Sequence, residues 1–118
     1  MTGARTVTVP TLDHGDVTLP EPAWCAGHRE GPAEYRADLH HAAPVPVPDG
    51  LVDIDAELVE YPYGTTPVPA SVYVELTAPG LTLDPDGLRA FAAGLVQRAA
   101  LLVEFADRLA VLRAGGAW

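Results

Sequence analysis

The last third of the chain carries an uninterrupted helical pattern, and this pattern limits what the remaining residues can fold into. Asp84 can cap a helix, Pro85 suits its first turn, and no proline follows. Gly115 and Gly116 provide a stop. We therefore predict a helix over residues 85–113, which at 1.5 Å per residue is about 43 Å long. Such a helix is longer than the face of a sheet of short strands, so part of it would extend beyond the sheet.

Apolar residues occupy more than one side of the predicted helix. Leucines recur every seven residues with alanines between them, giving the series Leu88, Ala92, Leu95, Ala99, Leu102, Ala106 and Leu109. Larger residues lie off this line, namely Phe91, Leu101, Phe105, Val111 and Leu112. Because small residues in such a line let two helices approach closely, we predict a homodimer that forms through the C-terminal helix. The alternative is a monomer in which the N-terminal hairpin covers the second face of the helix.

The residues before the helix show the two-residue alternation of β-strands. Runs of β-branched residues at 6–9 and 17–19, separated by a turn-like stretch, predict a hairpin. Alternation over 35–40, 52–58 and 71–76 predicts three more strands. The proline-rich link that begins at Pro44 cannot be a central strand, since proline gives no donor to a ladder. We therefore predict an α+β fold, with a mostly antiparallel sheet of four or five strands and the long helix packed on it.

One α+β domain is expected to hold all 118 residues. Within it, a hairpin and a Cys/His loop take residues 1–34, strands take 35–77, and the helix takes 85–113. Acidic residues number 16 against 7 basic ones, and the net charge is −9. Because phosphate recognition needs a basic surface, we predict no binding to nucleic acid or to anionic membranes. The opening residues lack the apolar run of a signal peptide and no stretch could span a bilayer, which predicts a cytoplasmic protein.

The single cysteine and all four histidines lie in one early stretch of the chain. Cys25 and His28 form a Cys-x-x-His unit, His14 precedes it, and His40-His41 follows. Thiolate and imidazole are ligands that zinc prefers, so the sequence predicts a zinc site. Neighbouring strand residues point to opposite faces, so the histidine pair should give one ligand. The predicted ligands are His14, Cys25, His28 and His40; the alternative is a buried cysteine beside Trp24, with histidines that make ordinary hydrogen bonds.

A third hypothesis makes Cys25 a catalytic nucleophile. His28 or His40 would activate the thiol, and Asp38 or Glu30 would orient the histidine. Two observations oppose it. A strongly acidic surface works against the low thiol pKa that a nucleophile needs, and the chain has no second cysteine for disulfide exchange.

Several blocks of the sequence resemble a family of small actinobacterial proteins of unknown function. The blocks are Thr6–His28, which contains a Trp-Cys-x-Gly-His motif, then Tyr35–His41, Val72–Leu76 and the Leu83-Asp84-Pro85 start of the helix. The absence of Lys and Asn, with Arg as every cation, is typical of a GC-rich genome and agrees with that origin. The resemblance implies a cytoplasmic actinobacterial protein and no known activity.

From these patterns we predict a small acidic accessory or regulatory module that binds another protein, is non-catalytic and forms a homodimer. A zinc-binding protein with a Cys/His site is the first alternative, and a cysteine-dependent enzyme is the second.

Overall fold

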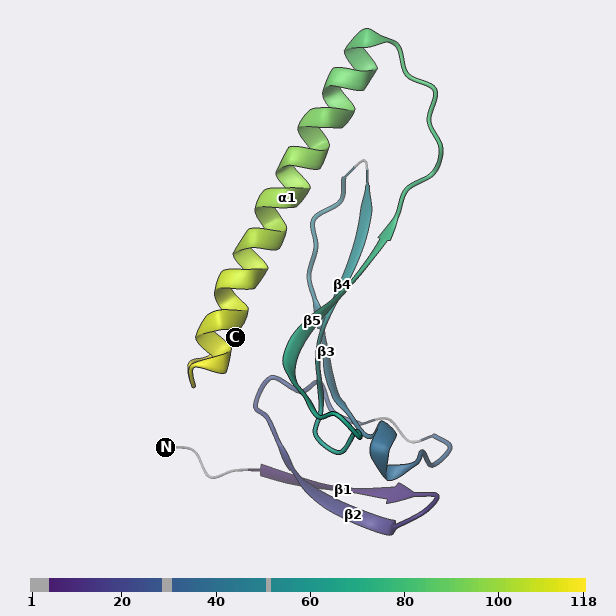
Figure 1. Cartoon of the computed structure of the whole chain (residues 1–118), viewed down its shortest axis with the longest axis vertical. Coiled ribbons are helices and arrows are strands. Elements are labelled where there is room, and N and C mark those ends of the chain that lie inside the picture. The colour runs from purple at the N-terminus through teal and green to yellow at the C-terminus, as the bar shows by residue number, and fades with distance from the viewer. Residues whose placement is uncertain (1–4, 29–30, 51) are drawn as a thin grey trace.

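The computed structural model describes residues 5–28, 31–50 and 52–118, and it has an elongated α+β arrangement (Figure 1). Its principal extents are 59 × 34 × 24 Å. A two-stranded hairpin lies at one end, a three-stranded antiparallel sheet forms the middle, and one long helix runs beside that sheet. Among the described residues, no helix has the length and apolar character needed to cross a membrane.

The N-terminal hairpin pairs β1 (Arg5–Thr11) with β2 (Gly15–Glu21) in antiparallel register. Gly15 has a φ of 61°, which glycine adopts without strain, and this lets the chain reverse within three residues. The hydroxyl of Thr11 closes the turn by donating to the Gly15 carbonyl at 2.7 Å and accepting from the His14 N–H at 2.9 Å. Leu19 on β2 is almost fully buried, so the hairpin has one face packed against the rest of the chain.

The central sheet has the strand order β3 (His41–Val45), β4 (Asp53–Tyr61) and β5 (Val68–Thr77). β4 carries the clearest alternation of the sequence. The apolar members Ile54, Ala56 and Leu58 are buried, and the intervening acidic residues are exposed. The middle strand therefore fixes which face of the sheet meets the helix.

Helix α1 (Pro85–Arg113) covers that face and spans the range that the sequence predicts. The Asp84 carboxylate caps it by accepting from the Gly87 N–H at 2.7 Å. Phe105 enters the core between Leu58 and Val45, and Arg113 donates through Nε to the Ala70 carbonyl of β5 at 2.6 Å. The C-terminal half of α1 holds these contacts, and its first turns extend past the ends of the strands (Figure 1).

Two of the expectations about strands are wrong. The five strands form two sheets instead of one. Residues 36–38 form a 3-10 helix, η1 (Arg36–Asp38), where the alternation predicted a strand. The Asp13 carboxylate, at the hairpin turn, accepts the Arg36 N–H at 2.9 Å, and Asp38 N–H donates to the Tyr35 carbonyl at 2.9 Å. Those bonds close a turn and consume the backbone donors that a sheet would need.

Pairing begins instead at His41 and ends at Val45, so it includes only the first two residues of the proline-rich link. The prediction that this link is not a central strand agrees with the strand order, in which β3 lies at an edge. Pro44 is accommodated because β3 is an edge strand of its sheet. The hairpin therefore joins the central sheet through the loop after β2 and through η1. Two backbone bonds mark this junction, from Ala26 N to Ala42 O at 3.0 Å and from Leu12 N to Glu34 O at 2.9 Å.

Candidate metal centre

Four side chains with metal-binding atoms converge at the junction between the hairpin and the central sheet. Glu21 is the last residue of β2, Cys25 and His28 lie in the loop that follows, and His41 is the first residue of β3. One ligand atom from each residue lies within 4.8 Å of the others. Within the described part of the chain this is the one such group of His, Cys, Asp and Glu side chains. Three separate segments are thus brought to one point.

The loop after β2 is shaped to present the sulfur of Cys25. Cys25 N–H donates to the Pro22 carbonyl at 3.1 Å, which closes a turn. Gly27 has a φ of 103°, a conformation that disfavours any side chain, and its N–H points at Cys25 Sγ at 3.4 Å. An N–H directed at sulfur stabilises the thiolate that a metal requires. The short Cys-x-Gly-His spacing therefore places the Cys25 thiol and the His28 imidazole on the same side of the loop.

The Glu21 carboxylate stands at the centre of the group. Its Oε1 atom lies 2.7 Å from His28 Nε2 and 3.3 Å from His41 Nδ1, and Cys25 Sγ lies 3.8 Å from His28 Nε2. Tetrahedral zinc separates oxygen or nitrogen ligands by about 3.3 Å, and sulfur and nitrogen ligands by about 3.5 Å. Two of the three distances are close to these values. The Glu21–His28 pair would need to open by roughly half an ångström for an ion of this geometry.

Most of the group is shielded from solvent, and the burial alters its acid–base behaviour. The side chains of Glu21 and His41 are 8% and 2% exposed, and that of His28 is 17% exposed. Burial raises the pKa of Cys25, and the nearby Glu21 carboxylate raises it further. Burial also pushes the pKa of Glu21 upward, but its polar contacts with Cys25, His28 and His41 outweigh burial and hold that pKa below its ordinary value. At neutral pH the group therefore combines a thiol with an ionised carboxylate.

His41 contains an unusual nitrogen. Its Nδ1 atom is buried and has no well-formed hydrogen bond to any residue that the structure describes. The nearest counter-charge is Glu21 Oε1 at 3.3 Å. The ring is fixed by edge-to-face contacts with Trp24 and His28, whose centroids lie 6.2 and 5.5 Å away. An imidazole nitrogen held in this way, without a bond that satisfies it, is costly unless another group binds it.

The structure brings together two of the four ligands that the sequence predicted. Cys25 and His28 belong to the group. His14 instead lies exposed at the hairpin turn, where Nδ1 is 3.0 Å from Asp13 Oδ2. His40 stacks on Tyr61 of β4, with ring centroids 4.9 Å apart, and its Nδ1 lies 3.1 Å from the Asp38 carbonyl.

Glu21 and His41 occupy the positions that the prediction gave to those two histidines. Of the pair His40-His41, the group contains His41. His40 lies before the first residue of β3, so the strand alternation used to choose one member of the pair does not apply to it. Glu21 had a weaker signal. It stands four residues before Cys25 and two residues after the predicted strand 17–19, but it is one of 16 acidic residues in the chain.

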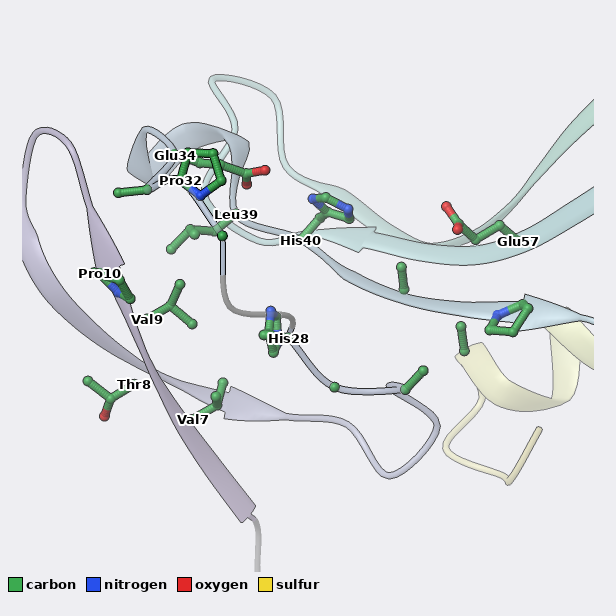
Figure 2. Close-up of a pocket in the computed structure, with 17 residues that line it drawn as sticks. Val7, Thr8, Val9, Pro10, His28, Pro32, Glu34, Leu39, His40 and Glu57 are labelled. Atoms are coloured by element: carbon green, nitrogen blue, oxygen red, sulfur yellow. The ribbon is translucent and has the colours of Figure 1, made fainter.

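A cleft of about 900 Å³ adjoins this group between the hairpin and the start of β3 (Figure 2). Val7 and Val9 of β1 line one side, and Leu39 and His40 line the other. Of the four residues of the group, His28 alone lines the cleft within the described parts of the chain. His28 is therefore the member of the group that borders the cleft.

The same geometry is a poor catalytic arrangement for Cys25. The contacts of His28 with Cys25 and with Glu21 both involve Nε2, so the carboxylate does not orient the ring from its second nitrogen. The thiol is buried and its pKa is raised, which lowers the thiolate fraction. Of the two residues predicted to orient the histidine, Asp38 touches His40 through its carbonyl, and Glu30 lies outside the described residues.

Comparison with known proteins gives one match. Residues 6–111 match a protein family described as a domain of unknown function, DUF6907, and this range contains the whole group of Glu21, Cys25, His28 and His41. No curated protein and no solved structure matches the chain.

Proposed function

The chain belongs to the DUF6907 family, whose function is unknown, and we propose that it is a non-catalytic zinc-binding module. The observation that carries this proposal is the buried group of Glu21, Cys25, His28 and His41, in which the Nδ1 atom of His41 lacks a well-formed hydrogen bond to any described residue. A bound cation would satisfy that nitrogen and would neutralise the carboxylate beside it.

The chemistry of the four donors favours zinc over other common cations. One thiolate and two imidazoles are ligands for borderline and soft metals, whereas calcium and magnesium take oxygen ligands. A single carboxylate is compatible with zinc at about 2.0–2.2 Å. The donor number also fits, since structural zinc is almost always bound by four ligands in a tetrahedron.

A structural role is supported by where the four residues come from. Glu21 ends the hairpin, Cys25 and His28 belong to the connecting loop, and His41 begins the central sheet. Zinc bound by all four residues would link these segments. Its four coordination positions would all be filled by protein ligands, which leaves none open for a substrate. Among the residues that the structure describes, few backbone bonds cross this junction, so a metal link there would contribute much of its rigidity.

Elemental analysis of protein purified without a metal-affinity tag tests the proposal. We expect about one zinc per chain, because a structural site purifies filled. Cys25→Ser and His41→Ala should lose the metal, whereas His14→Ala and His40→Ala should keep it, since those two side chains make contacts elsewhere. Less than about a tenth of an equivalent, with no uptake after incubation with zinc, would reject the site.

The non-catalytic, protein-binding role stays part of the proposal. It is favoured by the large apolar side chains that remain exposed on α1 at Val96 and Val111. Exposed apolar patches of this kind are typical of interaction surfaces. A cytoplasmic location also belongs to the proposal, because a reducing compartment keeps a lone thiol such as Cys25 available for zinc. The actinobacterial origin stays a prediction.

A further inference from the structure

A stripe of small and aliphatic residues follows the solvent side of α1. We call it the outer stripe, and it consists of Leu88, Ala92, Leu95, Ala99, Val103 and Ala106. Its members lie three or four residues apart, so they share one side of the helix. All are exposed, and Leu88, Leu95 and Val103 remain 58%, 43% and 60% accessible. The core-facing residues, such as Phe105 and Arg98, occupy another side of α1.

The chain has more surface than a compact protein of its size. Its accessible surface is 8135 Å², whereas a compact monomer of 12.4 kDa has about 6,100 Å². Its radius of gyration is 18.3 Å, against about 13.5 Å for a compact domain of this length. The surplus of about 2,000 Å² is within the range that one protomer of a stable dimer buries. The outer stripe places exposed apolar side chains along one continuous element of this extended surface.

We propose that two copies of the chain associate through the outer stripes of α1, antiparallel, about a two-fold axis at Ala99. The stripe residues are spaced symmetrically about Ala99, with intervals of four and then three residues in each direction along the helix. An antiparallel partner in this register places Ala99 against Ala99, Leu95 against Val103, and Ala92 against Ala106. Leu88 then faces Ala110, which is also exposed. Alanine at the crossing point lets the two helix axes come close, and larger side chains pack on either side of it.

The charges beside the stripe favour the antiparallel direction. Arg89 and Asp107 are separated by about five helical turns, so they lie on the same flank of α1. In the antiparallel register each Arg89 approaches Asp107 of the other copy, which gives two opposite-charge contacts. A parallel pair would keep these residues far apart along the axis. The stripe itself has no ionisable side chain, so the net charge of −9 is not concentrated where the two copies meet. Such rim charges set orientation more than affinity.

The N-terminal hairpin leaves the stripe available. The sequence allowed a monomer in which the hairpin covers the second face of the helix. In the structure the hairpin lies at the far end of the central sheet from the first turns of α1 (Figure 1). The outer stripe stays exposed along its length, and a second copy of α1 is the occupant that fits its symmetric spacing.

Light scattering after gel filtration tests the association. The full-length protein at micromolar concentration should have twice the 12.4 kDa chain mass. Ala99→Glu sets two carboxylates against each other at the axis and should give monomers with unchanged circular dichroism. Ala93→Glu adds the same charge to the same helix away from the stripe, so this control should remain dimeric. A monomeric wild type, or a dimer that survives Ala99→Glu, would overturn the proposal.

Cross-linking with a short bismaleimide tests the direction. Ala99→Cys should cross-link to itself, and Ala106→Cys alone should not, because its partner in this register is Ala92. The double variant with Ala92→Cys and Ala106→Cys should cross-link efficiently. The wild type is the background, since Cys25 is buried. Efficient cross-linking of Ala106→Cys alone would indicate a parallel pair and reject the proposed register. Repeating the mass measurement after zinc chelation separates this proposal from the metal site, because the stripe does not involve the metal residues.

Discussion

Glu21 Oε1 and His41 Nδ1 lie 3.3 Å apart across the junction of the two sheets, with both side chains largely buried. One residue ends the hairpin and the other begins the central sheet. The contact has the length of an ion pair but lacks the geometry of a good hydrogen bond, as His41 Nδ1 is left unsatisfied among the described residues. A cation bound to both atoms would satisfy the imidazole nitrogen and neutralise the carboxylate.

The neighbouring histidines His40 and His41 give a matched pair of variants. His41→Ala removes a buried ligand and should lower zinc affinity by more than about 100-fold, since even residues that only orient a ligand affect affinity by about 10–100-fold. His40→Ala removes a ring that stacks on Tyr61 and should change affinity by less than about threefold. Competition titration with a chromophoric chelator measures both. Equal losses in the two variants would contradict the assignment of His41.

Glu21 should make the metal-free protein sensitive to acid. Its pKa is lowered in the folded state from an ordinary value of 4.5, so the stability it contributes is present above about that pH and is lost as the pH falls through the folded pKa. Glu21→Gln should cost about 2 kcal/mol at pH 7, the value of a hydrogen bond to a charged group. Urea unfolding of both proteins at pH 7 and below pH 4 should show this difference shrinking. A difference that is constant with pH would contradict it.

Cys25 should make zinc binding release a proton. Its pKa is raised by burial and by the Glu21 carboxylate, so the thiol is protonated at neutral pH and must ionise when it binds zinc. We expect release of about one proton per zinc at pH 7, and affinity that rises by about tenfold per pH unit from this group alone. Calorimetry in buffers of different ionisation enthalpy measures the release. Cys25→Ser should lose the metal and therefore supplies the background heat, and zinc binding by the wild type without proton release would contradict the role of the thiol.

The sequence predicted the parts of the fold whose signals are local. The helix was predictable because Asp84, Pro85 and Gly115 mark its ends, and β4 was predictable because Ile54 and Leu58 alternate with acidic residues. The strand expected at 35–40 failed because the Asp13 carboxylate, 23 residues away in sequence, accepts the Arg36 N–H. Nothing near residue 36 reveals that bond, and a favourable alternation was therefore misleading.

The candidate site divides in the same way. Cys25 and His28 are three residues apart, and their shared loop could be predicted from spacing and from Gly27. The position of His41 depends on where strand pairing begins. The sequence predicted a strand over 35–40, whereas β3 begins at His41. Glu21 depends on the packing of one sheet against another, a long-range relation that leaves no local pattern. The separation of the five strands into two sheets was missed for the same reason, since strand patterns do not specify which edges pair.

Gly27 should be the most sensitive glycine of the metal loop. Its φ of 103° lies in a region that other residues rarely adopt, although a Cβ added there would meet no atom within 4 Å. Gly27→Ala should therefore cost about 1–3 kcal/mol through backbone strain and weaken zinc binding by turning the N–H away from Cys25 Sγ. Gly31→Ala is the matched control, because its added Cβ also meets nothing within 4 Å and no such φ is involved. Thermal unfolding of the zinc-loaded proteins compares them, and equal melting temperatures would contradict the prediction.

Zinc removal should loosen the hairpin before it affects the central sheet. The Ala26 N–H donates to Ala42 and the Leu12 N–H donates to Glu34, and both bonds cross the junction that the metal would hold. Hydrogen exchange at these amides should accelerate by about tenfold or more after chelation, because local opening no longer has to break a metal link. Amides that join β4 to β5, around Leu58 and Val72, should keep their exchange rates, since those strands are paired with each other and packed under Phe105. Uniform acceleration would mean that the metal controls global unfolding, and no acceleration at Ala26 would mean that it does not fasten the hairpin.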